Sequence, residues 1–127
     1  MDPVSDMFIR IKNAQNAGHG TVKIPFSKFK YEIAKTLERT HLVATIDRRG
    51  KQTKRILELR LIKDADGPGI RGIKLLSTPG KKAYISCRNM RPGQKRGIVI
   101  LSTSKGVMEA REAKKERVGG QLIAEVW

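Results

Sequence analysis

The spacing of apolar residues changes along this chain, and the change limits the folds that the chain can adopt. Up to about residue 42, apolar side chains recur every three or four positions, as in Met7, Ile11 and Ala14. This period is typical of helices with one buried face. Beyond that point the period becomes two, and within residues 55–62 leucines occupy every second position, as in strands. The two patterns together predict an α+β fold.

The first predicted lobe covers residues 1–66 and has the order helix, strand, helix, strand, strand. Its expected elements are a helix from residue 2 to Gly18, a strand at 21–24, a helix after Ser27, and strands at 43–46 and 55–62. Ser27 is the expected N-cap of the second helix, and Phe26 is expected to pack on Tyr31. That helix should carry an apolar stripe of Phe29, Ile33, Ala34 and Leu37, and residues 48–54 should form a turn. Residues 63–69 have linker chemistry, which places the lobe boundary between residues 66 and 67.

The second predicted lobe, residues 67–127, consists mostly of strands and has one helix. Its expected elements are strands at 73–76, 83–86, 98–101 and 121–127, and a helix from Val107 to about Lys115. Ser77–Gly80 is a strong turn signal between the first two of these strands. The run at 98–101 is wholly apolar, which is typical of a central strand that is buried on both faces.

Both lobes carry a large excess of positive charge. The chain has 27 Lys and Arg against 12 Asp and Glu, a net charge of +15, and each predicted lobe is basic by itself. Between residues 71 and 96 there is no acidic residue, whereas the basic residues there are Arg71, Lys74, Lys81, Lys82, Arg88, Arg91, Lys95 and Arg96. Surfaces that serve only solubility intersperse both signs. The charge therefore indicates a polyanionic partner, and nucleic acid is the best candidate.

Catalytic chemistry has little support in the sequence. His19 and His41 lack a neighbouring Cys, His or acid at ligand spacing, and Cys87 is the single cysteine of the chain. We therefore expect no metal site, no cofactor and no enzymatic activity. A single cysteine fits a reducing compartment, and no stretch approaches the ~20 apolar residues of a membrane span. We expect a soluble, cytoplasmic protein with no membrane partner.

Residues 102–106, with the sequence Ser-Thr-Ser-Lys-Gly, are the best candidate for a binding site. They place three hydroxyl groups and one ammonium group between an apolar strand and the expected helix. The free N–H groups at the start of that helix would add partial positive charge at the same place. This combination suits a phosphate or a base edge, although an ordinary N-cap with two spare polar residues has the same pattern.

Several segments share a pattern that identifies a family. They are Ser102–Met108, Val118–Gly120, Val126–Trp127, Asp2–Met7, Arg10–Asn13, Pro25–Lys30 and Ser77–Gly80 with Tyr84. Across nearly its whole length the chain resembles the bacterial small-subunit ribosomal protein family numbered eight. The resemblance implies a two-lobe α/β protein that binds the central domain of small-subunit ribosomal RNA early in assembly. Outside the ribosome such a protein is expected to be a monomer, and within it to contact neighbouring ribosomal proteins.

The resemblance also implies which residues contact RNA, to which we add Lys81 from the basic run. In the second lobe they are Ser102, Thr103, Ser104, Lys105, Gly106, Tyr84, Lys81, Gly119, Gly120 and Gln121. Gln121 stands where the family usually has Glu. In the first lobe they are Pro3, Ser5, Asn13, Ser27, Lys28 and Lys30. Double-stranded RNA is read through its shallow groove and its irregular loops, a geometry that suits short hydroxyl side chains.

Two other functions remain open at this point. The same surface could bind the messenger RNA of the protein's own operon and repress its translation, which the resemblance allows. A small nuclease is a third hypothesis, but the sequence lacks the carboxylate cluster that would hold metal ions. A cleavage assay with Mg²⁺ would separate a nuclease from a binding protein.

Overall fold

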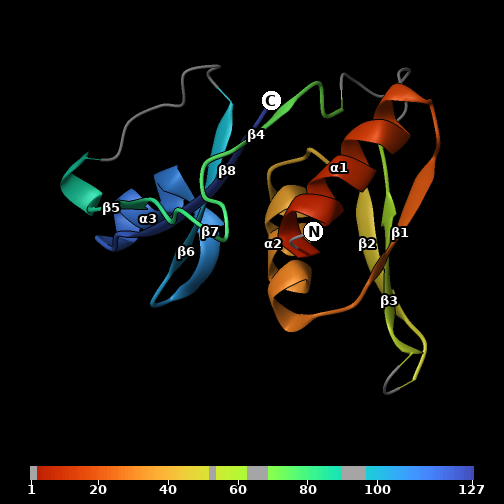
Figure 1. Ribbon diagram of the computed structural model, residues 1–127, viewed down its shortest axis with the longest axis horizontal. Helices are drawn as coiled ribbons and strands as arrows, with labels where there is room; N and C mark the ends of the chain where they lie inside the picture. The colour runs from red at the N-terminus through yellow and green to blue at the C-terminus, as the bar shows by residue number, and fades with distance from the viewer. Residues whose placement is uncertain (1–2, 52–53, 63–68, 90–96) are drawn as a thin grey trace. The chain divides into compact units, whose positions relative to one another are not determined.

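The computed structural model describes residues 3–51, 54–62, 69–89 and 97–127, which form two compact units (Figure 1). Unit 1 contains Pro3–Arg71, and unit 2 contains Gly72–Trp127. Each unit combines helix with antiparallel sheet, so the predicted α+β fold class is confirmed. The predicted lobe boundary, between residues 66 and 67, lies outside the described residues.

Unit 1 has the predicted order of elements. They are α1 (Pro3–Asn16), β1 (Thr21–Pro25), α2 (Lys28–Arg39), β2 (Thr45–Arg49) and β3 (Ile56–Arg60). The strands form one antiparallel sheet in the order β1-β3-β2, and both helices lie on the same face of it (Figure 1). The apolar residues that recur every three or four positions in the helices, and every second position in β3, fill the core between helices and sheet. They include Ile11, Ile33, Leu37, Leu57 and Leu59, all 0% exposed.

The start of α2 is built as the sequence predicts. The Ser27 hydroxyl accepts a hydrogen bond from the Lys30 amide at 3.1 Å, which satisfies one of the free N–H groups of the first turn. The rings of Phe26 and Tyr31 lie 6.0 Å apart between centroids, so the residue before the cap packs on the first turns of the helix. Phe29 departs from the predicted buried stripe, because its side chain is 36% exposed.

One strand of unit 1 is displaced from its predicted position. β2 covers Thr45–Arg49 and not residues 43–46, so Arg48 and Arg49 belong to the strand and not to the turn. The reason is that β2 pairs with β3 from Thr45↔Arg60 to Arg49↔Ile56, and this pairing extends the strand to Arg49. Most of β2 is exposed, and an exposed strand at the edge of a sheet tolerates charged residues that a sequence pattern assigns to a turn.

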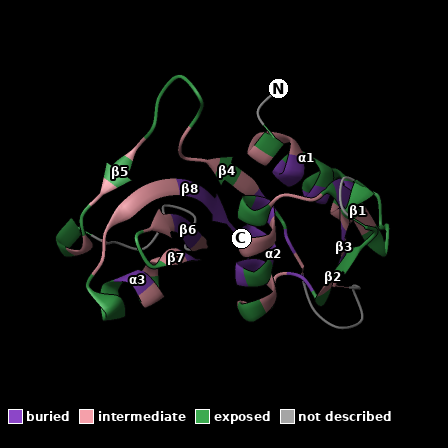
Figure 2. Cartoon of the chain, turned by 90° about the horizontal axis from the view of Figure 1, so that it is seen from below, coloured by how far each residue is buried: buried purple, intermediate pink, exposed green. Residues whose placement is uncertain are grey.

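Unit 2 is a sheet with one short helix. Its elements are β4 (Ile73–Leu75), β5 (Tyr84–Ile85), a 3-10 turn at Cys87–Asn89, β6 (Ile98–Thr103), β7 (Gly106–Glu109), α3 (Ala110–Glu116) and β8 (Gly120–Val126). The strand order is β4-β8-β6-β7, and β5 also pairs with β8. β6 is thus a central strand, and Val99, Ile100 and Leu101 are buried on its two faces as predicted (Figure 2). Val99 and Leu101 pack with Met108 and with Ala113 of α3.

The predicted helix from Val107 to Lys115 is wrong in its first part. Residues 107–109 belong to strand β7, and the helix begins only at Ala110. Val107 lies opposite Ser102, and Met108 lies opposite Leu101, so both are held by pairing with β6 and both are buried. Their apolar spacing fits a helix as well as a strand, and pairing with the preceding strand β6 decides between them.

Candidate nucleic-acid interface

The turn between β6 and β7 contains most of the predicted binding motif. Thr103 and Gly106 close a two-residue loop, Ser104-Lys105, so the motif is the tip of a β-hairpin. Gly106 has a φ of 112°, a backbone conformation that disfavours any residue with a side chain. The motif is therefore held by the two strands that flank it.

The three hydroxyl groups of the motif have different surroundings. The Thr103 hydroxyl donates to the Gly106 carbonyl at 2.8 Å and accepts from the Lys105 amide at 3.1 Å, so it is used within the turn. The Ser104 side chain is exposed, and Ser102 is half-buried. Neither serine hydroxyl is hydrogen-bonded to another of the described residues. Two of the three hydroxyls are therefore free to donate to, and accept from, a bound partner.

No helix begins at this loop, contrary to the expectation from the sequence. β7 separates the loop from α3, whose first residue is Ala110, and the side chain of the N-cap residue Glu109 makes no capping hydrogen bond. The partial positive charge of a helix terminus thus does not contribute to the hairpin tip. Its chemistry comes from the two serine hydroxyls and from Lys105.

A row of polar side chains crosses the sheet beside this turn. Tyr84 of β5 lies opposite Gln121 of β8, and Gln121 lies opposite Ser102 of β6. Directly opposed residues point to the same face of a sheet, with Cβ atoms about 5 Å apart. Leu101, the neighbour of Ser102, packs towards α3, so the polar row lies on the other face. We call Tyr84, Gln121 and Ser102 the polar row.

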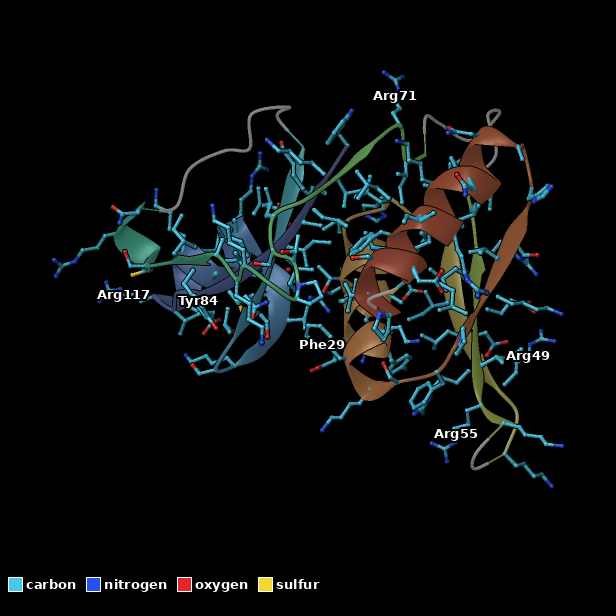
Figure 3. All side chains as sticks on the ribbon, in the orientation of Figure 1. Phe29, Arg49, Arg55, Arg71, Tyr84 and Arg117 are labelled. Atoms are coloured by element: carbon cyan, nitrogen blue, oxygen red, sulfur yellow. The ribbon has the colours of Figure 1, made fainter. Side chains whose placement is uncertain are left out.

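Tyr84 is the most exposed member of the polar row. Its side chain is 69% exposed and stands beside β5 in Figure 3, whereas Gln121 and Ser102 are half-buried. An exposed phenol offers an apolar ring and a hydroxyl group together. The structure thus places Tyr84, one of the implied RNA contacts, on the surface.

Gly119 and Gly120 allow the strands to approach closely at this row. A Cβ atom on Gly120 would lie 2.1 Å from the Ser102 carbonyl oxygen, and one on Gly119 would lie 2.4 Å from the Ile85 carbonyl oxygen. These are backbone atoms of paired strands, which cannot move aside as a flexible side chain can. The two glycines therefore fix the distance between β8 and its neighbours where the polar row begins.

The predicted cations of unit 2 differ in what they contact. Lys105 forms an ion pair with Glu116 of α3, 3.1 Å between Nζ and Oε2, in which both side chains are about half exposed. Lys81 is exposed and forms no ion pair with a described residue. It ends a turn closed by backbone hydrogen bonds in both directions between Thr78 and Lys81, at 2.8 and 3.1 Å.

Ser77 fixes that turn to the sheet. Its hydroxyl oxygen accepts from the Ala83 amide at 2.9 Å, and the hydroxyl also contacts the Leu122 carbonyl of β8. The segment from Ser77 to Ala83 is thus held at both of its ends. Ala83 is two positions from Lys81 and directly precedes Tyr84. Sequence reasoning missed this role of Ser77 and the role of Glu116. The turn sequence could have suggested the first, but no signal in the sequence indicated the second.

The six predicted contact residues of unit 1 lie on its two helices. Pro3, Ser5 and Asn13 belong to α1, and Ser27, Lys28 and Lys30 lie at the start of α2. Pro3, Asn13 and Lys28 are exposed, and Ser27 is occupied as the N-cap. Lys30 is buried, at 7% exposed, and so differs from the exposed phosphate contact that the resemblance implies.

The described residues contain neither a metal-binding cluster nor a membrane-spanning helix. Among the described residues, no group of three or more His, Cys, Asp or Glu side chains is placed to hold a metal ion. In the same part of the chain, no helix is both long and apolar enough to span a membrane.

Comparison with known proteins gives one consistent result. The family model described as ribosomal protein S8 matches residues 2–127. The "Small ribosomal subunit protein uS8" of Anaeromyxobacter sp. (strain Fw109-5) is 42% identical over 129 residues, covering 99% of this chain and 97% of the relative. The proteins of the same name from Prochlorococcus marinus (strain MIT 9211) and Mycoplasmopsis agalactiae (strain NCTC 10123 / CIP 59.7 / PG2) are 38% and 37% identical, with the same coverage.

Proposed function

The chain belongs to the ribosomal protein S8 family, and we propose that it is a structural component of the small ribosomal subunit that binds the subunit's RNA directly. Its target is the central domain of the RNA, which it reaches early in assembly and helps to fold into the platform. The chain is a binding protein and not an enzyme, since the relatives compared above are all named as ribosomal proteins.

One observation carries the proposal: polar side chains from three strands, with no side-chain hydrogen bond to another described residue, meet at one end of unit 2. The polar row, Tyr84, Gln121 and Ser102, lies next to the exposed hydroxyl of Ser104 at the hairpin tip. These groups donate and accept hydrogen bonds but carry no net charge. Such a surface selects a partner by shape and hydrogen bonding, and the cations around it supply attraction to phosphate.

RNA with an irregular helix is the partner that fits this chemistry. Regular RNA duplexes hide their base edges in a deep groove, so proteins read 2′-hydroxyls and the bases of internal loops. Short serine hydroxyls on a rigid hairpin reach such groups without the flexibility of a lysine. The exposed ring of Tyr84 can stack on an unpaired base, and one such contact contributes about 1–3 kcal/mol to binding.

Chemical footprinting of the complete small-subunit RNA, with and without the pure protein, tests the proposal. We expect protection in one irregular helix of the central domain and no protection elsewhere at low protein concentration. Ser104→Ala should remove part of this protection at the same salt concentration. Protection spread evenly over all RNA domains would contradict the proposal, because it would mean that the protein binds phosphate alone.

A messenger RNA with the same irregular helix would compete for the same surface. The protein would then also repress translation of its own operon, as the alternative function requires. Footprinting on that transcript separates the two functions: protection there at the concentration that protects ribosomal RNA supports repression, and its absence restricts the protein to the ribosome. We also propose that the free protein is a cytoplasmic monomer that contacts neighbouring ribosomal proteins only after it has bound RNA.

A further inference from the structure

Three cations of unit 1 lie over two aromatic rings. The Arg48 guanidinium is 4.8 Å from the centroid of the Tyr31 ring, and the Lys35 ammonium is 5.4 Å from the same centroid. The Arg55 guanidinium is 5.7 Å from the centroid of the Phe26 ring. All three distances lie within the range of cation–π attraction. We call these five residues the cation–ring cluster.

Local structure explains why the five side chains meet. Tyr31 and Lys35 are one turn apart on α2, so they share a face of that helix. Arg48 lies opposite Leu57, a buried residue of β3, which places Arg48 on the face of the sheet that the helices cover. Arg55 precedes β3, and its carbonyl accepts from the Phe26 amide at 3.1 Å. Secondary structure therefore brings the three cations and the two rings together.

The neighbouring arginine of β2 provides a contrast to these cations. Arg49 points to the opposite face of β2, where its guanidinium lies 3.3 Å from Asp47 and 3.6 Å from Glu58. In contrast, neither Arg48, Arg55 nor Lys35 forms an ion pair with a carboxylate of the described residues. Their positive charges are consequently not neutralised within the part of unit 1 that the structure describes.

The arrangement favours a phosphate ligand. Each guanidinium of the cluster lies near a ring and carries paired N–H groups, which match two oxygens of one phosphate. Less side-chain entropy is then lost on binding than for a free arginine. A protein partner would instead require an apolar anchor, but both rings of the cluster are half-buried and have cations beside them.

We propose that the cation–ring cluster is a second RNA-binding surface, which binds the phosphate backbone of a duplex without sequence preference. The inference rests on the proposed function, and it adds to it a contact in unit 1 that differs from the helix positions implied by the family resemblance. It assigns to unit 1 an electrostatic contribution to affinity. The choice of RNA site is then left to the polar row and Ser104 in unit 2.

Two adjacent arginines of one strand provide a matched test. Arg48→Gln and Arg49→Gln each remove one positive charge from β2, but only the first belongs to the cluster. Binding of the complete protein is measured with a regular RNA duplex of about 20 base pairs, and with a central-domain fragment, over a series of salt concentrations. Arg48→Gln should weaken both complexes about fivefold near 0.1 M salt and lower the salt slope by about one. Arg49→Gln should weaken them less than about twofold, because that charge is already paired.

Two more variants and one competitor complete the experiment. Arg48→Gln/Arg55→Gln should weaken binding about twentyfold, whereas Arg48→Lys, which keeps the charge but lacks the paired N–H groups, should recover only part of the affinity. Circular dichroism melts must coincide with wild type, so that a loss of affinity is not a loss of fold. Poly-glutamate should compete less well than the duplex at equal charge concentration.

Several results would overturn the inference. They are equal losses for Arg48→Gln and Arg49→Gln, unchanged affinity of the double variant, and stronger competition by poly-glutamate, which would indicate an acidic protein partner. Failure of the inference can be distinguished from failure of the proposed function. If wild-type protein binds neither RNA, the proposed function fails. If it binds both and the cluster variants bind equally well, only the inference about the cluster fails.

Discussion

Removal of single hydroxyl groups from the β6–β7 turn should separate stability from RNA recognition. Thr103→Val keeps the shape of the side chain but removes the hydroxyl that donates at 2.8 Å and accepts at 3.1 Å within the turn. Each such hydrogen bond contributes about 0.5–1.5 kcal/mol, and the turn is partly open to water. We therefore expect the free energy of unfolding to fall by about 1–2 kcal/mol.

Ser104→Ala is the complementary change. The Ser104 hydroxyl is exposed and makes no hydrogen bond with another described residue, so the free energy of unfolding should stay within about 0.5 kcal/mol of wild type. If the hydroxyl contacts RNA in a desolvated position, binding of the central-domain fragment should weaken by about 1–3 kcal/mol. That loss corresponds to a factor of about 5 to 150 in the dissociation constant.

Urea unfolding gives the stabilities, and fluorescence anisotropy at one fixed salt concentration gives the affinities for the central-domain fragment and for an unrelated duplex. The expected result is a loss of stability for Thr103→Val and a loss of cognate affinity alone for Ser104→Ala. If Ser104→Ala weakened both RNAs equally, its hydroxyl would not contribute to the choice of site. An unchanged unfolding curve for Thr103→Val would show that the turn does not depend on its hydroxyl.

Three further predictions concern the same end of unit 2. Gly120→Ala should lower the free energy of unfolding by about 1–3 kcal/mol in urea titrations, because its Cβ would lie 2.1 Å from a backbone oxygen of β6. Glu116→Gln should free Lys105 and raise affinity for every RNA up to about fivefold, with little change in stability, since exposed ion pairs contribute at most about 1 kcal/mol. Replacing Lys81 and Lys82 by Gln should weaken binding of unrelated RNAs equally and lower the salt slope by about two in titrations against salt.

Much of the fold could be predicted because local signals and long-range contacts agree. The sequence around Phe26, Ser27 and Tyr31 predicted that Ser27 caps the helix and that Phe26 packs on Tyr31. The structure confirms both. The alternation of Leu57 and Leu59 predicted β3, whose inner face is buried by two helices. Where one face of an element is fully buried, periodicity alone specifies which residues point inward.

The prediction failed where two periods fit the same residues. Val107 and Met108 are apolar neighbours followed by Ala110 and Ala113, which suits the start of a helix as well as a strand. Pairing with β6 makes these residues a strand. The spacing of apolar residues in the sequence does not show that this pairing forms. The consequence was functional as well as structural, since the helix terminus expected at the binding loop does not exist there.

Proximity within the candidate site could be inferred only in part. Family resemblance grouped Tyr84 and the Gly119–Gly120 turn near the hydroxyl motif, and the strand register places Gln121 directly between Tyr84 and Ser102. No spacing in the sequence could show this, because Ser102 is 18 positions from Tyr84 and 19 positions from Gln121. Their role in binding RNA remains a prediction.

The total of 27 Lys and Arg residues overstates how many cations the protein offers to RNA. Some cations are already paired within the described part of the chain, as Lys105 is with Glu116 and Arg49 is with Asp47 and Glu58. Exposed pairs of this kind can open at little cost, but each phosphate contact then releases a carboxylate into water beside the RNA, which opposes binding. The cations without such partners, among them those of the cation–ring cluster, attract RNA without this opposition. The salt dependence of binding should therefore follow the unpaired cations and not all 27 Lys and Arg residues, and Arg48→Gln and Arg49→Gln compare one cation of each kind.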